Sequence, residues 1–162
     1  INSGLNVADD VTYSGTVAGA MEGALIGIRS IALSQAYNYE NDERVVPYGT
    51  AEALAPALLR KLIATELPIG VLLNVNFPNC PPEEVVGPVV ASQGKLSYGI
   101  WVEERRDGRS LPYYWLRFGR DEPEVKPGTD LHAVRNKQIS VTPLKLDMTA
   151  HELRDQLAKA IA

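Results

Sequence analysis

Cysteine is almost absent from this chain, whose 162 residues include only Cys80. A single cysteine excludes an intrachain disulfide and fits a reducing compartment, so we expect a cytoplasmic protein. Long apolar runs are also missing, and no segment approaches the roughly 20 apolar residues of a membrane-spanning helix. We therefore expect no membrane association.

Basic clusters and the common catalytic motifs are lacking as well. Lys and Arg number 16 against 20 Asp and Glu, a formal net charge of -4, so duplex nucleic acid is not an expected partner. There is no Gly-Lys-Ser/Thr of a P-loop, no dinucleotide-type glycine spacing, no Gly-x-Ser-x-Gly elbow and no Cys/His metal spacing. Any phosphate chemistry must therefore come from a different pattern.

The most informative stretch runs from Asn6 to Gly23, where a Tyr-Ser-Gly-Thr turn leads into a helix of small apolar residues. Free N–H groups and the positive dipole end at a helix start attract anions. Ser14, Gly15 and Thr16 stand there, and Gly15 has no Cβ to keep a ligand away. These features indicate a phosphoryl-binding turn. The alternative is an ordinary N-cap, in which a hydroxyl only satisfies the first helical N–H groups.

A polar loop over residues 1–11 precedes this turn. Its side chains offer oxygen atoms of the kind that Mg²⁺ and Mn²⁺ prefer. These residues are Asn2, Ser3, Asn6, Asp9 and Asp10. A solvated loop with Asx turns is the alternative interpretation.

The order of loop, helix and strand predicts an α/β fold with a parallel sheet. We expect helices over 16–26, 50–66 and 130–134, the second capped by Thr50, and a last helix started by a capping box of Thr149 and Glu152. Expected strands cover 30–34, 71–77, 85–91, 98–104, 112–118 and 138–144, with Asn74 and Asn76 on one face.

Two connecting segments carry further predictions. Residues 35–49 predict a flap over a site, in which Tyr37 and Tyr39 either stack on a base or anchor the loop. Asp107-Gly108 predicts the turn of a long aromatic hairpin, which packs on a partner subunit or on its own domain.

Asp147 and His151 lie four residues apart at the start of the last helix. A carboxylate and an imidazole at this spacing can form an acid/base pair. A structural contact that fixes the entry into the helix is the favoured interpretation.

These motifs, taken in order, resemble the SurE family of metal-dependent nucleotidases, also called survival proteins. Its members carry Ser-Gly-Ile-Asn, Gly-x-Asn and Tyr-Ser-Gly-Thr-Val before a Glu-Gly-bearing helix. Ile1-Asn2, Gly4-Leu5-Asn6 and Tyr13 to Val17 match these pieces. Further matches are SIALS at 30–34, LNVNFP at 73–78, TDLHAV at 129–134 and ISVTPLKLDMTAH at 139–151.

The resemblance implies a phosphomonoesterase that hydrolyses nucleoside 5′- and 3′-monophosphates, with short polyphosphate as a further substrate. It implies that Asn2 is a ligand of one Mg or Mn ion per subunit. It also implies that Asn6, Ser14 and Thr16 are catalytic and bind phosphate together with Gly15. The alternative is a non-catalytic module that binds a nucleotide or phosphate and forms oligomers.

The resemblance also implies an architecture. Residues 1–80 would be the C-terminal part of a Rossmann-like domain that is incomplete at its N-terminus. Residues 81–162 would supply a β-hairpin arm, a returning strand and a C-terminal helix exchanged within a homodimer or homotetramer. Asp147 and His151 would then fix the exchanged helix.

Two departures from the family pattern matter. The family's paired aspartates and a metal-binding Ser lie upstream of Ser-Gly-Ile-Asn, so we expect the other metal ligands in a segment that precedes this sequence. Ala8 stands where many members have Gly, and we expect this change to adjust the loop.

Overall fold

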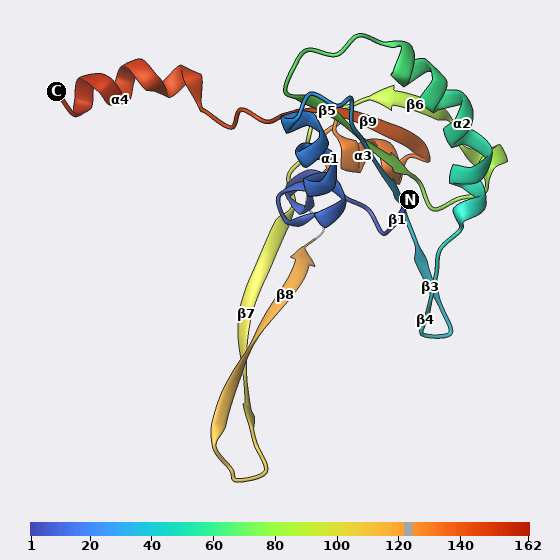
Figure 1. The fold of residues 1–162 in the computed structure, drawn as a ribbon. Coiled ribbons are helices and arrows are strands. Elements are labelled where there is room, and N and C mark those ends of the chain that lie inside the picture. The colour runs from blue at the N-terminus through green and yellow to red at the C-terminus, as the bar shows by residue number, and fades with distance from the viewer. Residues whose placement is uncertain (122–124) are drawn as a thin grey trace.

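A five-stranded sheet forms the body of the computed structural model, which describes residues 1–121 and 125–162 (Figure 1). Its strand order is β1-β2-β5-β9-β6, with β1 parallel to β2 and β2 parallel to β5. β9 runs antiparallel to β5, and β6 runs parallel to β9. The strands are β1 (Asn2–Ser3), β2 (Ile31–Gln35), β5 (Val71–Phe77), β6 (Gly87–Val90) and β9 (Gln138–Lys145). The predicted α/β class is confirmed, although the sheet is mixed rather than purely parallel.

The two longer helices, α1 (Gly15–Leu25) and α2 (Tyr48–Ala64), cover opposite faces of the sheet. Successive side chains of a strand point to opposite faces. In β5, Leu72 therefore packs in the cluster of α1, whereas Val75 packs in the cluster of α2. A third cluster joins η1 (Ala8–Tyr13) to α3 (Asp130–Arg135).

Two predicted helix caps are wrong. α2 begins at Tyr48, so Thr50 lies inside the helix, where its buried hydroxyl donates to the carbonyl of Cys80. That bond ties α2 to the loop after β5. Thr149 and Glu152 form no capping box: η3 (His151–Leu153) and α4 (Arg154–Ala160) begin without a side-chain cap, and the Thr149 N–H donates to Asp147 at 2.9 Å.

Two hairpins project from the same side of the body (Figure 1). The short one, β3 (Asn38–Glu40) and β4 (Glu43–Val45), lies within the predicted flap. The long one, β7 (Ser97–Arg106) and β8 (Pro112–Asp121), confirms the predicted hairpin. α4 lies apart from the body, at the end of an extended segment (Figure 1).

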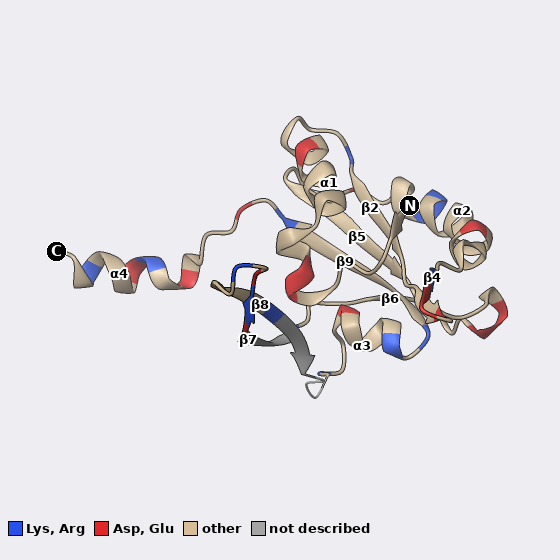
Figure 2. Ribbon diagram, turned by 90° about the horizontal axis from the view of Figure 1, so that it is seen from below, with Lys and Arg blue, Asp and Glu red and all other residues tan. Residues whose placement is uncertain are grey.

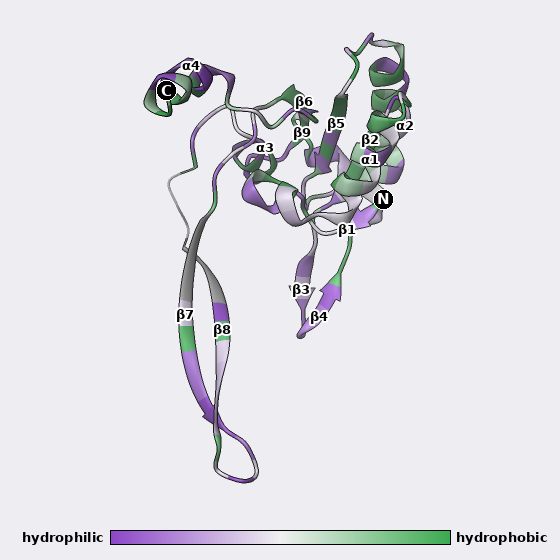
Figure 3. Cartoon of the chain, turned by 60° about the vertical axis from the view of Figure 1, so that its left-hand side comes forward, coloured by the Kyte–Doolittle hydropathy of each residue, from purple (hydrophilic) through white to green (hydrophobic). Residues whose placement is uncertain are grey.

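The β7–β8 hairpin mixes charge with large apolar side chains. Basic and acidic residues both lie along it (Figure 2), and short hydrophobic stretches lie beside hydrophilic ones (Figure 3). Trp101 is 50% exposed and Trp115 is 54% exposed. Such a surface is typical of a contact region. The exchange of α4 between subunits stays a prediction, as does the division of the chain at residue 80, although β5 and β9 share one sheet.

A single buried carboxylate joins three segments of the body. Asp130 accepts hydrogen bonds from the backbone N–H groups of Ala8 at 2.9 Å, Gly94 at 2.8 Å and Leu131 at 2.7 Å. Burial raises the pKa of the Asp130 carboxyl, and the N–H donors oppose this effect. Ala8 has φ of +52°, in the left-handed region that favours glycine.

We predict that Asp130→Asn lowers the free energy of unfolding by about 2 kcal/mol, because the amide NH₂ would face buried N–H donors. Urea unfolding measures the change. Asp155→Asn on exposed α4 is the control and should change little. Equal stability of the wild type and Asp130→Asn would contradict the assigned role.

Candidate functional site

The candidate site lies where the three parallel strands end. β1, β2 and β5 finish at residues that pair across the sheet: Ser3 with Gln35, and Gln35 with Phe77. In open α/β sheets, ligands bind outside the carboxyl ends of parallel strands. Residues 4–8 and the β3–β4 hairpin both leave the sheet at this edge.

A row of polar residues crosses the sheet one step before this edge. Directly paired residues share a face of the sheet. The row consists of Asn2, Ser34, Asn76 and Ser140, which pair in this order from β1 to β9. Ser34, Asn76 and Ser140 are fully buried. The row lies on the face that α1 covers. Leu72 packs against α1 on this face, and Asn76 points to the same face because the two lie an even number of positions apart in β5.

Asn6 is held on this row by buried hydrogen bonds. Its backbone N–H donates to Asn76 Oδ1 at 2.8 Å, and its side-chain Nδ2 donates to Ser34 Oγ at 2.6 Å. Its carbonyl accepts from Asn74 Nδ2 at 2.7 Å and from Asn76 Nδ2 at 3.2 Å. Asn6 therefore fixes the path of the loop after β1. Sequence reasoning missed Ser34, although the alternation of Asn74 and Asn76 was a signal for this network.

The side chain of Asn2, in β1, makes one hydrogen bond to the loop that follows. Its Nδ2 donates to the carbonyl of Gly4 at 2.9 Å, so the amide oxygen Oδ1 is the atom that can meet a ligand. An amide oxygen suits a hard divalent cation. Asn2 and Asn6 both line a pocket of about 520 Å³ beside the β3–β4 hairpin. The residue present thus fits the role of a metal ligand.

The residues at the start of α1 line two different pockets. The Ser14 hydroxyl accepts from the Val17 N–H at 3.1 Å, so the N-cap is formed. Ser14 lines a pocket of about 510 Å³ together with Asp147, whereas Thr16 shares a hollow of about 400 Å³ with Asn2. Gly15 is exposed, and a Cβ there would meet nothing within 4 Å. The phosphate-binding roles of Ser14, Gly15 and Thr16 stay predictions.

Asp147 and His151 form a surface pair. His151 Nε2 lies 2.7 Å from Asp147 Oδ2, and both side chains are more than half exposed. Hydrogen bonds from Thr149 and His151 hold the pKa of Asp147 well below its usual range. This geometry agrees with a contact that fixes the chain before α4, while a role in helix exchange stays a prediction.

Within residues 1–121 and 125–162, no three or more His, Cys, Asp or Glu side chains gather in a group that could hold a metal ion. Among the helices of the same residues, none has the length and apolarity to cross a membrane.

The fold defines an α/β protein, and its candidate ligand site lies at the carboxyl end of the parallel strands. The chain belongs to the SurE family, because the family model described as Survival protein SurE matches residues 1–100. The fold agrees: a crystal structure of the SurE protein from Aquifex aeolicus superposes with a TM-score of 0.84 at 36% identity, covering 100% of this chain and 63% of that one.

Curated relatives named 5′-nucleotidase SurE are similar over the same span. The relative from Mesorhizobium japonicum is 75% identical over 162 residues, and the one from Chelativorans sp. is 65% identical. The relative from Brucella anthropi is 59% identical over 161 residues. This chain spans 64%, 64% and 62% of their respective lengths.

The hydrogen bond from the Val17 N–H to the Ser14 hydroxyl should contribute to stability. Ser14→Ala should lower the free energy of unfolding by about 1 kcal/mol, because the Val17 N–H loses its acceptor. Ser14→Asn should keep most of the stability, since Asn caps as well as Ser. Urea unfolding of the variants measures both effects. A neutral Ser14→Ala, or an Asn variant as unstable as the Ala variant, would contradict the cap.

Proposed function

We propose that the protein is a metal-dependent phosphomonoesterase that hydrolyses nucleoside 5′- and 3′-monophosphates to nucleoside and phosphate. The observation that carries the proposal is the placement of Asn2 and buried Asn6 together at the carboxyl edge of the sheet, beside the start of α1. The name of the curated relatives, 5′-nucleotidase SurE, supports it. Hydrolysis of short polyphosphate is part of the same proposal.

We assign Asn2 Oδ1 as one ligand of a Mg²⁺ or Mn²⁺ ion, one per subunit. Such an ion supplies charge neutralisation and polarises a phosphoryl group when bound. One amide oxygen does not hold a divalent ion alone. We place the remaining ligands in the part of the longer relatives that this sequence does not span.

The residues of this chain bind and orient the phosphoryl group. The Thr16 hydroxyl and the free N–H groups at the start of α1, including that of Gly15, donate hydrogen bonds to its oxygen atoms. These donors stabilise negative charge as it develops in the transition state. Asn6, clamped to Ser34 and Asn76, keeps the loop after β1 in place without needing to move during turnover.

We further propose that the protein works in the cytoplasm as a homodimer or homotetramer. The exposed Trp101 and Trp115 of the β7–β8 hairpin, and Leu157 of α4 at 59% exposure, are the surfaces that a second subunit would cover.

Phosphate release from a nucleoside monophosphate, measured with the full-length protein, tests this function. Activity should vanish with a chelator and return with Mn²⁺ or Mg²⁺. Asn2→Ala and Thr16→Val should each lower kcat/KM by about a hundredfold, because each removes a contact to the metal or the phosphoryl group. Glu22→Gln, on the exposed face of α1, is the control and should keep full activity.

Full activity in Asn2→Ala and Thr16→Val would contradict the site assignment. Tight nucleotide binding without phosphate release, with or without metal, would favour the binding module instead. Light scattering of the wild-type sample should give a mass above that of one chain, and a strict monomer would contradict the assembly.

A further inference from the structure

The β3–β4 hairpin lies directly on the end of β1, which carries Asn2, and on the loop that follows it, which carries Asn6. Arg44 donates a hydrogen bond to the carbonyl of Ser3, the last residue of β1. A Cβ built on Gly4, which has φ of +115°, would lie 2.9 Å from Arg44 Nη2 and 3.2 Å from Tyr37 Cε1. Gly4 therefore permits a close approach of the hairpin that any other residue would disturb.

One face of this hairpin is aromatic and cationic. Tyr39 pairs directly with Arg44 across the two strands, and Tyr37 precedes Tyr39 by two residues, so their side chains share a face. The Arg44 guanidinium lies 3.8 Å from the centroid of the Tyr37 ring. The rings of Tyr37 and Tyr39 meet edge to face, with 5.5 Å between their centroids. Glu40 and Glu43 pair on the opposite face.

This face closes the pocket of about 520 Å³ that Asn2 and Asn6 line from the other side. Among the described residues, the lining holds one cation, Arg44, and no carboxylate. The Tyr37 ring is covered by Arg44, whereas Tyr39 is 66% exposed. A free aromatic face beside a cation suits a ligand that has a flat π-system and a negative charge.

We propose that this pocket holds the nucleoside part of the substrate, with the base stacked on Tyr39 and the phosphoryl group directed toward Asn2. The assignment rests on the proposed function and names the groups that would favour nucleotides over other phosphomonoesters. Arg44 acts as a positioning residue, because its bond to Ser3 and its contact with Tyr37 hold the hairpin over the loop. Stacking accepts every base, so the pocket does not select one base by hydrogen bonding.

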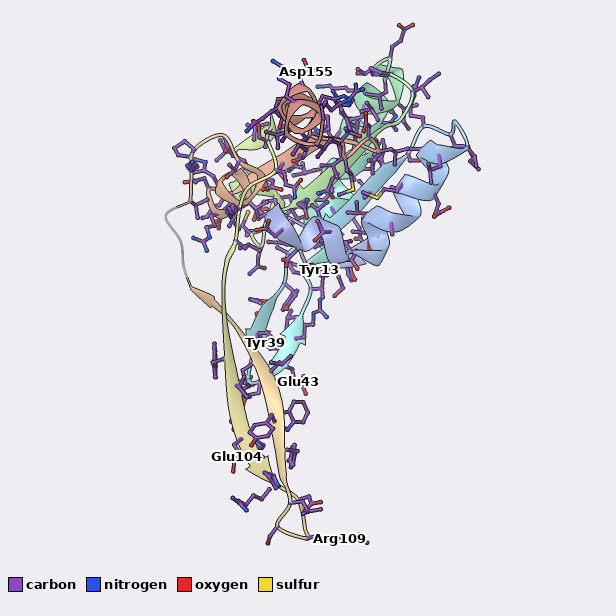
Figure 4. All side chains as sticks on the ribbon, turned by 90° about the vertical axis from the view of Figure 1, so that its left-hand side faces the viewer. Tyr13, Tyr39, Glu43, Glu104, Arg109 and Asp155 are labelled. Atoms are coloured by element: carbon purple, nitrogen blue, oxygen red, sulfur yellow. The ribbon has the colours of Figure 1, made fainter. Side chains whose placement is uncertain are left out.

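The test uses Tyr39→Ala, Tyr39→Phe and, as a control on the same hairpin, Glu43→Ala, all in the full-length protein. Tyr39 and Glu43 both lie on the projecting hairpin and away from the core, so neither change should unfold the protein (Figure 4). Phosphate release is measured with AMP and CMP, and with ribose 5-phosphate, which has no base. Adenosine binding is measured by calorimetry.

Tyr39→Ala should raise KM for AMP and CMP at least about fivefold, and more for AMP, because base stacking is lost. Its kcat/KM for ribose 5-phosphate should equal that of the wild type. Adenosine binding should weaken by a similar factor, while Tyr39→Phe and Glu43→Ala behave as wild type.

Unchanged KM for both nucleotides and unchanged adenosine binding in Tyr39→Ala would overturn the pocket assignment while leaving the phosphomonoesterase function standing. An equal loss with ribose 5-phosphate would also overturn it, since the effect would not depend on the base. If the wild-type protein releases no phosphate, the proposed function fails, and the adenosine measurement alone decides the pocket.

Discussion

The clamp on Asn6 is the interaction on which the candidate site depends. Its backbone and side chain make buried hydrogen bonds to Ser34, Asn74 and Asn76, which lie in the two central parallel strands. Breaking buried hydrogen bonds of this kind costs stability, because the groups left behind lose their partners away from water. The loop between β1 and α1 is thereby anchored at Asn6, and Asp130 anchors it again at Ala8. Asn2 and the start of α1 stand on either side of these two anchors.

Much of the fold follows from the sequence. The apolar run of 71–77 predicts β5 residue for residue, and the Asp107-Gly108 turn between two strand-like runs predicts the long hairpin. Local patterns do not determine tertiary partners, however. Its position in the sequence predicts Thr50 as a helix cap, but its hydroxyl donates to the carbonyl of Cys80. The antiparallel direction of β9 depends on its pairing with β5, which hydrophobic periodicity does not predict.

The site was predictable only in part, for the same reason. Asn2, Asn6 and Thr16 stand out because of the motif, and the structure brings Asn2 beside each of the others. Ser34 and Asp130 lie in segments that match the family, but their contacts could not be predicted from those segments, because their partners are 28 and 122 residues away in the chain. Likewise, the sequence leaves Tyr37 and Tyr39 open between anchoring and stacking. The structure separates them: the Tyr37 ring is covered by Arg44, and Tyr39 is exposed.

We propose that Asn2 joins a divalent metal site at the carboxyl edge of the sheet. The most direct measurement is a crystal structure of the full-length protein soaked with Mn²⁺, with anomalous diffraction data collected at the manganese edge. We expect one strong anomalous peak per subunit within coordination distance of Asn2 Oδ1. A fully active crystal form with manganese bound only elsewhere, or with no peak near Asn2, would contradict it.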